Sequence, residues 1–132
     1  EKGIGKGGYA LHFKGRPLNE VDEHAFGQGT SQFMGLHETI YGPFFPDEGS
    51  FLSHRDGYVL GQRKTVLNCN ISENYITGAE NEHSGWMDLK CCAIGNVIGG
   101  KHVVDYILTL CSHSPKCQLP SKPIRIVDCG EL

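Results

Sequence analysis

The run WMDLKCCAIGNV, Trp86–Val97, is the most informative stretch of the chain. Trp86, an aromatic residue that could form the wall of a pocket, is followed by an acidic turn and then by the apolar residues of Cys91–Ile94. A glycine pair, Gly99–Gly100, comes shortly afterwards. Because glycine adopts turn conformations that other residues avoid, this order predicts a turn, a short strand, a second turn and then a helix.

The segment after the glycine pair has the clearest helical pattern in the chain. We expect a short amphipathic helix over Lys101–Cys111. Its apolar residues recur at spacings of three and four, which gathers them on one helix face. They are Val103, Val104, Ile107, and Leu110 or Cys111. No comparable pattern occurs earlier, so the rest of the chain is expected to form strands and turns.

Several short runs favour β-strands because they combine β-branched, aromatic and aliphatic residues between turn-forming residues. They are Tyr9–Phe13, Val59–Leu60, Thr65–Cys69, Tyr75–Thr77 and Ile124–Cys129. Glycine accounts for 18 of the 132 residues. The usual share is about 7%, so this excess also favours strands and tight turns. Together these patterns predict a mainly β fold.

The connections between these runs differ in character. Asn19–His24 is polar and acidic, and we expect a solvated loop or a single helical turn there. Ile40–Asp47 is rich in proline and aromatic residues and is expected to form a rigid loop. In Phe26–Phe33, Gln28 lies between two glycines whose backbone freedom would let it project its amide. This segment is therefore a candidate binding element.

Length and charge exclude several classes of protein. A chain of 132 residues is long enough for one modest core, so we expect a single domain over residues 1–132. A formal net charge of -3 provides no basic field for binding phosphates, and we expect no nucleic-acid partner. The longest apolar runs are far too short to span a bilayer, so no membrane partner is expected.

Six cysteines do not form the dense framework of a small disulfide-stabilised scaffold. They are Cys69, Cys91, Cys92, Cys111, Cys117 and Cys129. Neighbouring residues of a strand point to opposite faces, so Cys91 and Cys92 would face different surroundings. We expect free buried thiols and a cytoplasmic or nuclear location.

The segment Gly95–His102, GNVIGGKH, nearly matches a phosphate-binding loop. That chemistry needs a serine or threonine hydroxyl after the lysine to hold magnesium, and His102 stands there instead. A nucleotide-binding fold also needs several βα units downstream, for which too little chain remains. An ordinary glycine turn that leads into a helix is the preferred interpretation.

Metal binding and nucleophilic catalysis have weaker signals. Cys111, His113 and Cys117 are close in sequence, but structural zinc sites usually combine two spaced C-x-x-C pairs, and no such pair is present. A cysteine–histidine pair could involve Cys69 or Cys91, although sequence spacing defines no geometry for it. We expect no metal site.

Four segments in one order resemble the cyclophilins. The tryptophan, acid and apolar strand of Trp86–Val97 continue without a gap to Ser112, as in that family. Ile40–His54, IYGPFFPDEGSFLSH, resembles the family's isoleucine-tyrosine-glycine turn with its following phenylalanine, acids and histidine. Asp128–Leu132 resembles the usual ending, and Glu1–Gly5 resembles the loop before the catalytic strand. The resemblance covers nearly the whole chain.

This resemblance implies a fold and an activity. Cyclophilins are closed, eight-stranded antiparallel β-barrels capped by helices, and they isomerise X-Pro peptide bonds without a cofactor. The chain starts where the family is already past its first two strands and first helix. We therefore expect a cyclophilin-like antiparallel β-barrel with a capping helix, without those N-terminal elements.

The resemblance also implies which residues would act in catalysis. Rotation about an X-Pro bond is slow because of amide resonance, and a donor to the prolyl nitrogen weakens that resonance. In cyclophilins this donor is an arginine. Its place is taken here by Phe13, with Lys14 and Arg16 nearby, and Gln28 matches the glutamine that orients the substrate carbonyl. The principal donor is thus expected to be replaced.

A peptide-binding groove is implied in the same way. Trp86 matches the tryptophan associated with cyclosporin binding, and Phe26 lies near the position of a pocket aromatic. The other groove positions carry replacements: Tyr75 for the phenylalanine that forms the pocket floor, Met87 for a leucine, Cys91 for a histidine, Arg63 for a small residue and Lys64 for an asparagine.

Two functions follow from this pattern. The first is a divergent peptidyl-prolyl isomerase with weak or no activity, and the second is a non-catalytic protein-binding module within a larger protein. Both would bind a proline-containing peptide or protein segment, with weak cyclosporin binding at best. A third interpretation assigns the aromatic residues to a plain core, which is the commoner role of an aromatic in a small domain: Phe13, Phe26, Tyr75 and Trp86.

Overall fold

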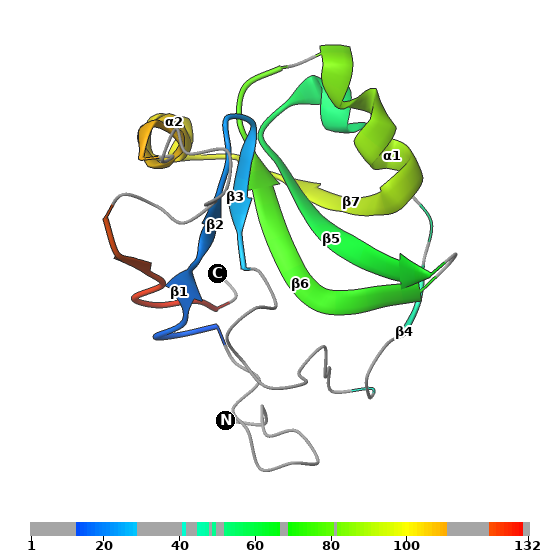
Figure 1. The fold of residues 1–132 in the computed structure, drawn as a ribbon, viewed down its shortest axis with the longest axis horizontal. Helices are drawn as coiled ribbons and strands as arrows, with labels where there is room; N and C mark the ends of the chain where they lie inside the picture. Colours follow the sequence, from blue (N-terminus) through cyan, green and yellow to red (C-terminus); the bar gives the residue numbers. More distant parts are fainter. Residues whose placement is uncertain are drawn as a thin grey trace.

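A computed structural model describes residues 13–28, 41, 45–47, 49, 52–66, 69–80, 82–110 and 122–130 (Figure 1). In chain order its elements are β1 (Pro17–Leu18), β2 (Glu20–Val21), β3 (Ala25–Gly27), β4 (Phe45–Pro46), η2 (His54–Asp56), β5 (Val59–Val66), β6 (Cys69–Thr77), η3 (Glu82–Trp86), α1 (Met87–Lys90), β7 (Cys91–Asn96), α2 (Lys101–Thr109) and β8 (Ile124–Arg125). The prediction of a mainly β protein is confirmed.

The strands form one large antiparallel sheet and one small one. The large sheet has the order β2-β3-β6-β5-β7, and β4 pairs with the start of β6. In the small sheet β1 pairs with β8. Register shifts interrupt β5 on both sides, and such bulges bend a strand. Figure 1 accordingly shows β5 and β6 as a long, strongly curved pair.

The described strands form only part of the expected barrel. A barrel requires the last strand to pair with the first, whereas the strand path in the described ranges runs from β2 to β7 without closing. The runs expected at Val59–Leu60 and Tyr75–Thr77 belong to the long strands β5 and β6. The run expected at Thr65–Cys69 is not one strand, because β5 ends at Val66, β6 begins at Cys69, and residues 67–68 lie outside the described residues. Ladder hydrogen bonds come from the backbone, so they continue through the polar residues between those runs.

One further expectation, near the start of the described chain, needs correction. Asn19–His24 is not a loop or helical turn throughout, because Glu20–Val21 forms β2 and pairs with β3. The acidic turn between them is held by Asp22, whose Oδ1 accepts the backbone N–H groups of His24 and Ala25, both at 2.7 Å. Val21 is fully buried, since it packs against the core rather than facing solvent.

Of the strands expected at the two ends, Tyr9–Phe13 is described only at Phe13, and the C-terminal one is shorter than predicted. Phe13 lies in a turn, where its carbonyl accepts the Arg16 N–H at 3.0 Å, and Tyr9–His12 lies outside the described residues. Of Ile124–Cys129, only the first two residues form β8. Beyond β8, the Ile126 carbonyl accepts the Gly15 N–H, and the Ile126 N–H donates to the Arg16 carbonyl, so backbone hydrogen bonding continues past the end of the strand.

The helix predicted after the glycine pair is confirmed as α2. Gly100 precedes it with a φ of 77°, a left-handed conformation that favours glycine. Val104 is buried, but Val103 is 49% exposed, and Leu108 joins Ile107 in packing against the core instead. The short helices η2, η3 and α1 were not predicted, because three to five residues are too few to show a helical period.

Two clusters of buried side chains form the core. One joins Val21, Phe26 and Val104 beneath α2. The other joins Tyr75, Met87 and Cys91 with Ala25, where α1 leads into β7. Figure 1 shows α2 beside the β2–β3 hairpin and α1 alongside β5 and β7. Within the described ranges, no helix has the length and apolar character needed to cross a membrane.

Candidate functional site

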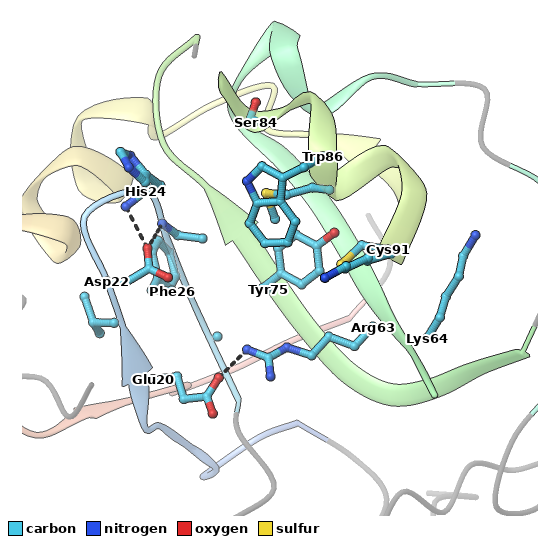
Figure 2. A pocket seen from close by; sticks show the side chains of 15 residues that line it. Glu20, Asp22, His24, Phe26, Arg63, Lys64, Tyr75, Ser84, Trp86 and Cys91 are labelled. Carbon is cyan, nitrogen blue, oxygen red and sulfur yellow. Dashed lines mark hydrogen bonds and ion pairs between the residues drawn. The ribbon is translucent and has the colours of Figure 1, made fainter. Parts of the chain in front are cut away.

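A cavity of about 500 Å³ opens between the β2–β3 hairpin, strands β5 and β6, and the segment from η3 to α1 (Figure 2). We call it the groove. Its lining includes all seven residues that the sequence assigns to a peptide-binding groove: Phe26, Arg63, Lys64, Tyr75, Trp86, Met87 and Cys91. These residues come from six elements, β3, β5, β6, η3, α1 and β7, so only the folded chain gathers them.

The floor of the groove is apolar. Tyr75 on β6, 6% exposed, packs with Met87 of α1 and Cys91 at the start of β7, and Ala25 of β3 completes this cluster. Trp86 stands at the lip with 57% of its surface exposed. An apolar floor beneath an exposed indole suits a small apolar ring that enters from solvent.

The hydroxyl of Tyr75 takes part in a buried polar chain. It lies 2.5 Å from Nε2 of His54, and Nδ1 of the same ring lies 2.5 Å from Oδ1 of Asp88. Asp88 also accepts the His54 backbone N–H at 2.9 Å and the Ser53 hydroxyl at 2.8 Å. The floor tyrosine is therefore tied to the first turn of α1 through a fully buried histidine.

The electrostatics of this chain assign its protons. Burial raises the pKa of the Tyr75 hydroxyl far above its ordinary value, so the hydroxyl stays protonated. Partial burial opposes ionisation of Asp88, but hydrogen bonds from His54 and Ser53 outweigh it and lower the pKa of that carboxyl. The ionised Asp88 is thus the acceptor for Nδ1 of His54, and the Tyr75 hydroxyl and Nε2 lie within hydrogen-bond distance of each other.

Arg63 crosses the rim of the groove. Its Nη2 lies 2.5 Å from Oε2 of Glu20 on β2, and its Nη1 lies 3.7 Å from Oε2 of Glu73 on β6. Figure 2 shows the side chain reaching from β5 toward Glu20 below Tyr75. With 46% of the Arg63 side chain exposed, the guanidinium is accessible to solvent while two carboxylates flank it.

The other cations of the lining are also engaged. Lys64 forms an ion pair with Asp47, in which Nζ and Oδ2 are 2.5 Å apart. The hydrogen bond from Lys64 lowers the pKa of Asp47. Lys90 places its ammonium 5.8 Å from the Trp86 ring centroid, within the range of a cation–π contact. The groove therefore presents an apolar floor with charges that are paired at its rim.

Phe13 and Gln28, the two positions matched to catalytic roles, lie elsewhere. Both line a second cavity of about 220 Å³, which is mainly apolar. Phe26 and Tyr75 border this second cavity as well as the groove. The amide nitrogen of Gln28 is buried and has no hydrogen-bond partner in the part of the chain that the structure describes.

The alternative donors are not in the groove either. Lys14 pairs with Asp128 at 3.3 Å, and neither Lys14 nor Arg16 contributes to the groove lining. Arg63 is the guanidinium that the described residues place there. Gly95–His102 forms the end of β7, a glycine turn and the start of α2, with Lys101 directed over the Tyr58 ring at 4.8 Å. This confirms the ordinary glycine turn.

Metal and disulfide expectations can be compared only for the described residues. There, no group of three or more potential ligands gathers, and Cys111, His113 and Cys117 lie outside the described ranges. Four cysteines are free: Cys69, Cys91, Cys92 and Cys129. Cys129 is exposed, so the expectation of buried thiols is wrong for that residue. Burial raises the pKa of Cys92 to about 11, which makes this thiol a poor nucleophile.

Sequence reasoning missed part of the groove. The lining also contains Glu20, Asp22, His24, Ala25, Ser84 and Lys90. Glu20 had no local signal, since it is 43 positions from its partner Arg63. His54 and Asp88 were visible only as parts of two family-like segments, and nothing in either segment indicates that they meet below the groove.

Comparison with models of protein families gives an independent result. Residues 11–131 match the family described as cyclophilin type peptidyl-prolyl cis-trans isomerase/CLD. The match spans the whole groove, the second cavity and every described element. With its mainly β, antiparallel structure, the chain belongs to the cyclophilin-type peptidyl-prolyl isomerase family.

Proposed function

We propose that the groove binds a proline-containing segment of a peptide or protein and that this chain isomerises X-Pro bonds weakly or not at all. The observation that carries the proposal is the placement of the two sets of residues. All seven groove residues share one cavity, whereas Phe13 and Gln28 line another. Recognition and catalysis are therefore expected to be separable in this protein.

The size and chemistry of the groove support recognition of a prolyl ring. A volume of about 500 Å³ lies within the range of about 300–1,000 Å³ that is typical of ligand sites. The ring would rest on Tyr75 and Met87, which are both buried. The exposed indole of Trp86 would cover it from the solvent side.

The surroundings of the guanidinium support weak catalysis. An efficient isomerase needs a donor aimed at the prolyl nitrogen in the transition state. Arg63 instead directs Nη2 to Glu20 and has Glu73 beside Nη1. Carboxylates compensate its positive charge, so it is a poorer donor to a substrate than a free guanidinium would be.

A non-catalytic binding module within a larger protein is the second candidate. The phenylalanine at position 13 favours it, because an aromatic ring cannot replace the donor function of a guanidinium. For cyclosporin we propose weak binding, supported by Trp86 in the lining and opposed by the Arg63–Glu20 pair across the rim. The free thiols support the proposed cytoplasmic or nuclear location.

The chain offers its own reporter for a binding test. Trp86 is its single tryptophan and lines the groove, so its fluorescence reports directly on occupancy. A proline peptide should change the emission in a saturable way. The matched alanine peptide lacks two ring carbons, each worth about 0.8 kcal/mol when buried, and should bind about tenfold more weakly. Equal affinity for both peptides would contradict recognition of the prolyl ring.

A thiol footprint locates the bound peptide. Cys91 lies in the groove lining, and Cys129 lies in the lining of the second cavity. We expect a saturating proline peptide to slow alkylation of Cys91 and to leave Cys129 unchanged, as read by mass spectrometry. Protection of Cys129 alone would place the peptide in the second cavity and overturn the proposal. A protease-free isomerisation assay on the same peptide measures the catalytic part.

A further inference from the structure

We propose that His54 and Asp88 form a positioning relay that holds the Tyr75 ring in one orientation and couples the groove floor to the wall on α1. The relay is a property of the free protein. Its effect on peptide affinity rests on the proposed function of the groove, so the two can be tested apart.

The relay connects elements that are distant in sequence. His54, in η2, is 21 positions from Tyr75 and 34 positions from Asp88. Its side chain is fully buried between them, with both ring nitrogens engaged at 2.5 Å. Its backbone is fixed as well, since the N–H donates to Asp88 and the carbonyl accepts the Ser84 hydroxyl at 2.9 Å. The imidazole therefore has little freedom to rotate.

Hydrogen bonds join every member of the relay. The Tyr75 hydroxyl is bonded to Nε2, and Nδ1 is bonded to Asp88, which also accepts from Ser53. Every buried polar atom of His54 is thereby satisfied. Removal of either neighbour would leave a ring nitrogen buried without its partner, which is a costly state. The relay therefore favours one rotamer of Tyr75 over its alternatives.

Sterics restrict the same ring from the opposite strand. Gly61 of β5 pairs with Tyr75, and a methyl group built at position 61 would come within 2.3 Å of Cζ and of the hydroxyl oxygen. The ring thus occupies space that a side chain at position 61 would need. The absence of a side chain at Gly61 leaves space for the Tyr75 ring, and the hydrogen bond to His54 holds the ring in that position.

The consequence for the groove follows from the position of Asp88. It directly follows Trp86 and Met87, the two residues of the wall next to the floor. A shift of the Tyr75 ring would change the anchoring of α1 and with it the wall. Because its hydroxyl is bonded to His54, Tyr75 presents mainly its ring to the groove, where Figure 2 shows it beside Trp86.

Tyr75→Phe tests the relay by removing one hydroxyl. The matched control is Tyr58→Phe, because the Tyr58 hydroxyl also bonds a carboxylate, Asp105 on α2, at 3.0 Å and lies outside the groove lining. We expect Tyr75→Phe to shift Trp86 emission and to weaken proline-peptide binding about fivefold, the equivalent of one buried hydrogen bond. Tyr58→Phe should change neither.

His54→Asn tests the relay from its other side. Asparagine can still donate to Asp88 from a position close to that of Nδ1, but it cannot reach the Tyr75 hydroxyl. If the two residues act through one bond, the double variant should bind peptide no more weakly than either single variant. Additive losses in affinity would overturn the relay. The relay also fails if Tyr75→Phe binds peptide within twofold of the wild type and has unchanged Trp86 emission.

The wild-type protein provides a readout that needs no variant. A histidine N–H that is buried against a carboxylate should give a slowly exchanging downfield proton resonance in the NMR spectrum, and Tyr75 should flip slowly. Absence of both signals contradicts the relay even if His54→Asn does not fold. If no proline peptide binds the wild type while both signals are present, the proposed function fails and the relay stands.

Discussion

The groove and the second cavity share Phe26 and Tyr75, yet they differ in whether their polar groups have bonding partners. In the groove, Arg63 and Lys64 are paired with carboxylates, and the Tyr75 hydroxyl is bound below the floor. In the second cavity, polar atoms of Gln28 and Asn74 are buried without partners among the described residues.

Under the proposed function, this difference would separate recognition from catalysis. Buried polar groups without partners are costly, so a site prepared for a ligand usually satisfies them or aims them at that ligand. In the groove, the cations Arg63 and Lys64 are paired with carboxylates, and the apolar floor is free for a ring. The second cavity holds the positions matched to catalysis by resemblance, with a phenylalanine where the family has its donor. We therefore expect substitutions in one cavity to leave the other unchanged.

The largest effect is expected from Gly61→Ala. A methyl group at this position meets the Tyr75 ring at 2.3 Å, so the ring or the strand must move. We expect a loss of about 1–3 kcal/mol in the free energy of unfolding, measured by urea denaturation, together with weaker peptide binding.

The control is Gly95→Ala, on the neighbouring strand β7. A methyl group there has no heavy atom within 4 Å. Its stability should stay within about 0.5 kcal/mol of the wild type. Equal effects of the two substitutions would show that the floor ring is not tightly held.

Gln28→Met tests the second cavity with a side chain of similar length and shape. Since the Gln28 amide nitrogen is buried without a partner in the described chain, its replacement should raise the free energy of unfolding by up to about 1 kcal/mol or leave it unchanged. Peptide affinity, read by Trp86 fluorescence, should stay within twofold. A large loss of affinity would place Gln28 in the recognition site and remove the contrast between the cavities.

Arg63→Gln has a smaller expected effect on stability. With 46% of its side chain exposed, the ion pair with Glu20 should contribute less than about 1 kcal/mol. Lys14→Gln, which removes the exposed pair with Asp128, is the control. We expect any residual isomerase activity to persist in Arg63→Gln. Its abolition there, but not in the control, would show that Arg63 has taken over the donor role.

The smallest expected effect is a loss of stability at low pH. The folded pKa of Asp88 lies below its ordinary value of 3.8, so its contribution to stability is fully present above that value. The contribution should be lost as the pH falls below 3.8 through the folded pKa. Urea denaturation between pH 5 and pH 2.5 should therefore show a steeper loss of stability for the wild type than for Asp88→Asn. Parallel curves would mean that the carboxylate is not stabilised by His54 and Ser53.

The sequence alone predicted elements whose patterns are local. The helix α2 and the strand β7 were predictable because a glycine turn and a three- to four-residue period are visible in one short window. The strand β2 was missed because Val21 is buried by residues of other elements, Phe26 of β3 and Val104 of α2, and a local pattern does not show such contacts. The short helices have no period to detect, and barrel closure is a property of strand pairing that local patterns do not report.

The groove residues were predicted from family resemblance rather than from local chemistry. Tyr75 and Cys91 have no site signal in their own segments, and Trp86 has only that of an aromatic residue that could form the wall of a pocket. Only alignment to a family pattern assigned the three to one site. The polar partners below and around them could not be found in this way. Whether Glu20 meets Arg63, or His54 meets Tyr75, depends on the curvature of β5 and β6 and on the position of α1.

Exchange NMR spectroscopy of a proline peptide mixed with the wild-type chain is the decisive test of peptide binding without efficient catalysis, because one experiment reports both binding and isomerisation. We expect the peptide resonances to shift on binding. We also expect cis–trans exchange at least about 100-fold slower than with an equal amount of a fully active cyclophilin, since one preorganised donor is worth about that factor. Exchange as fast as with the active enzyme, or no shift of the peptide resonances, would show that the proposed function is wrong.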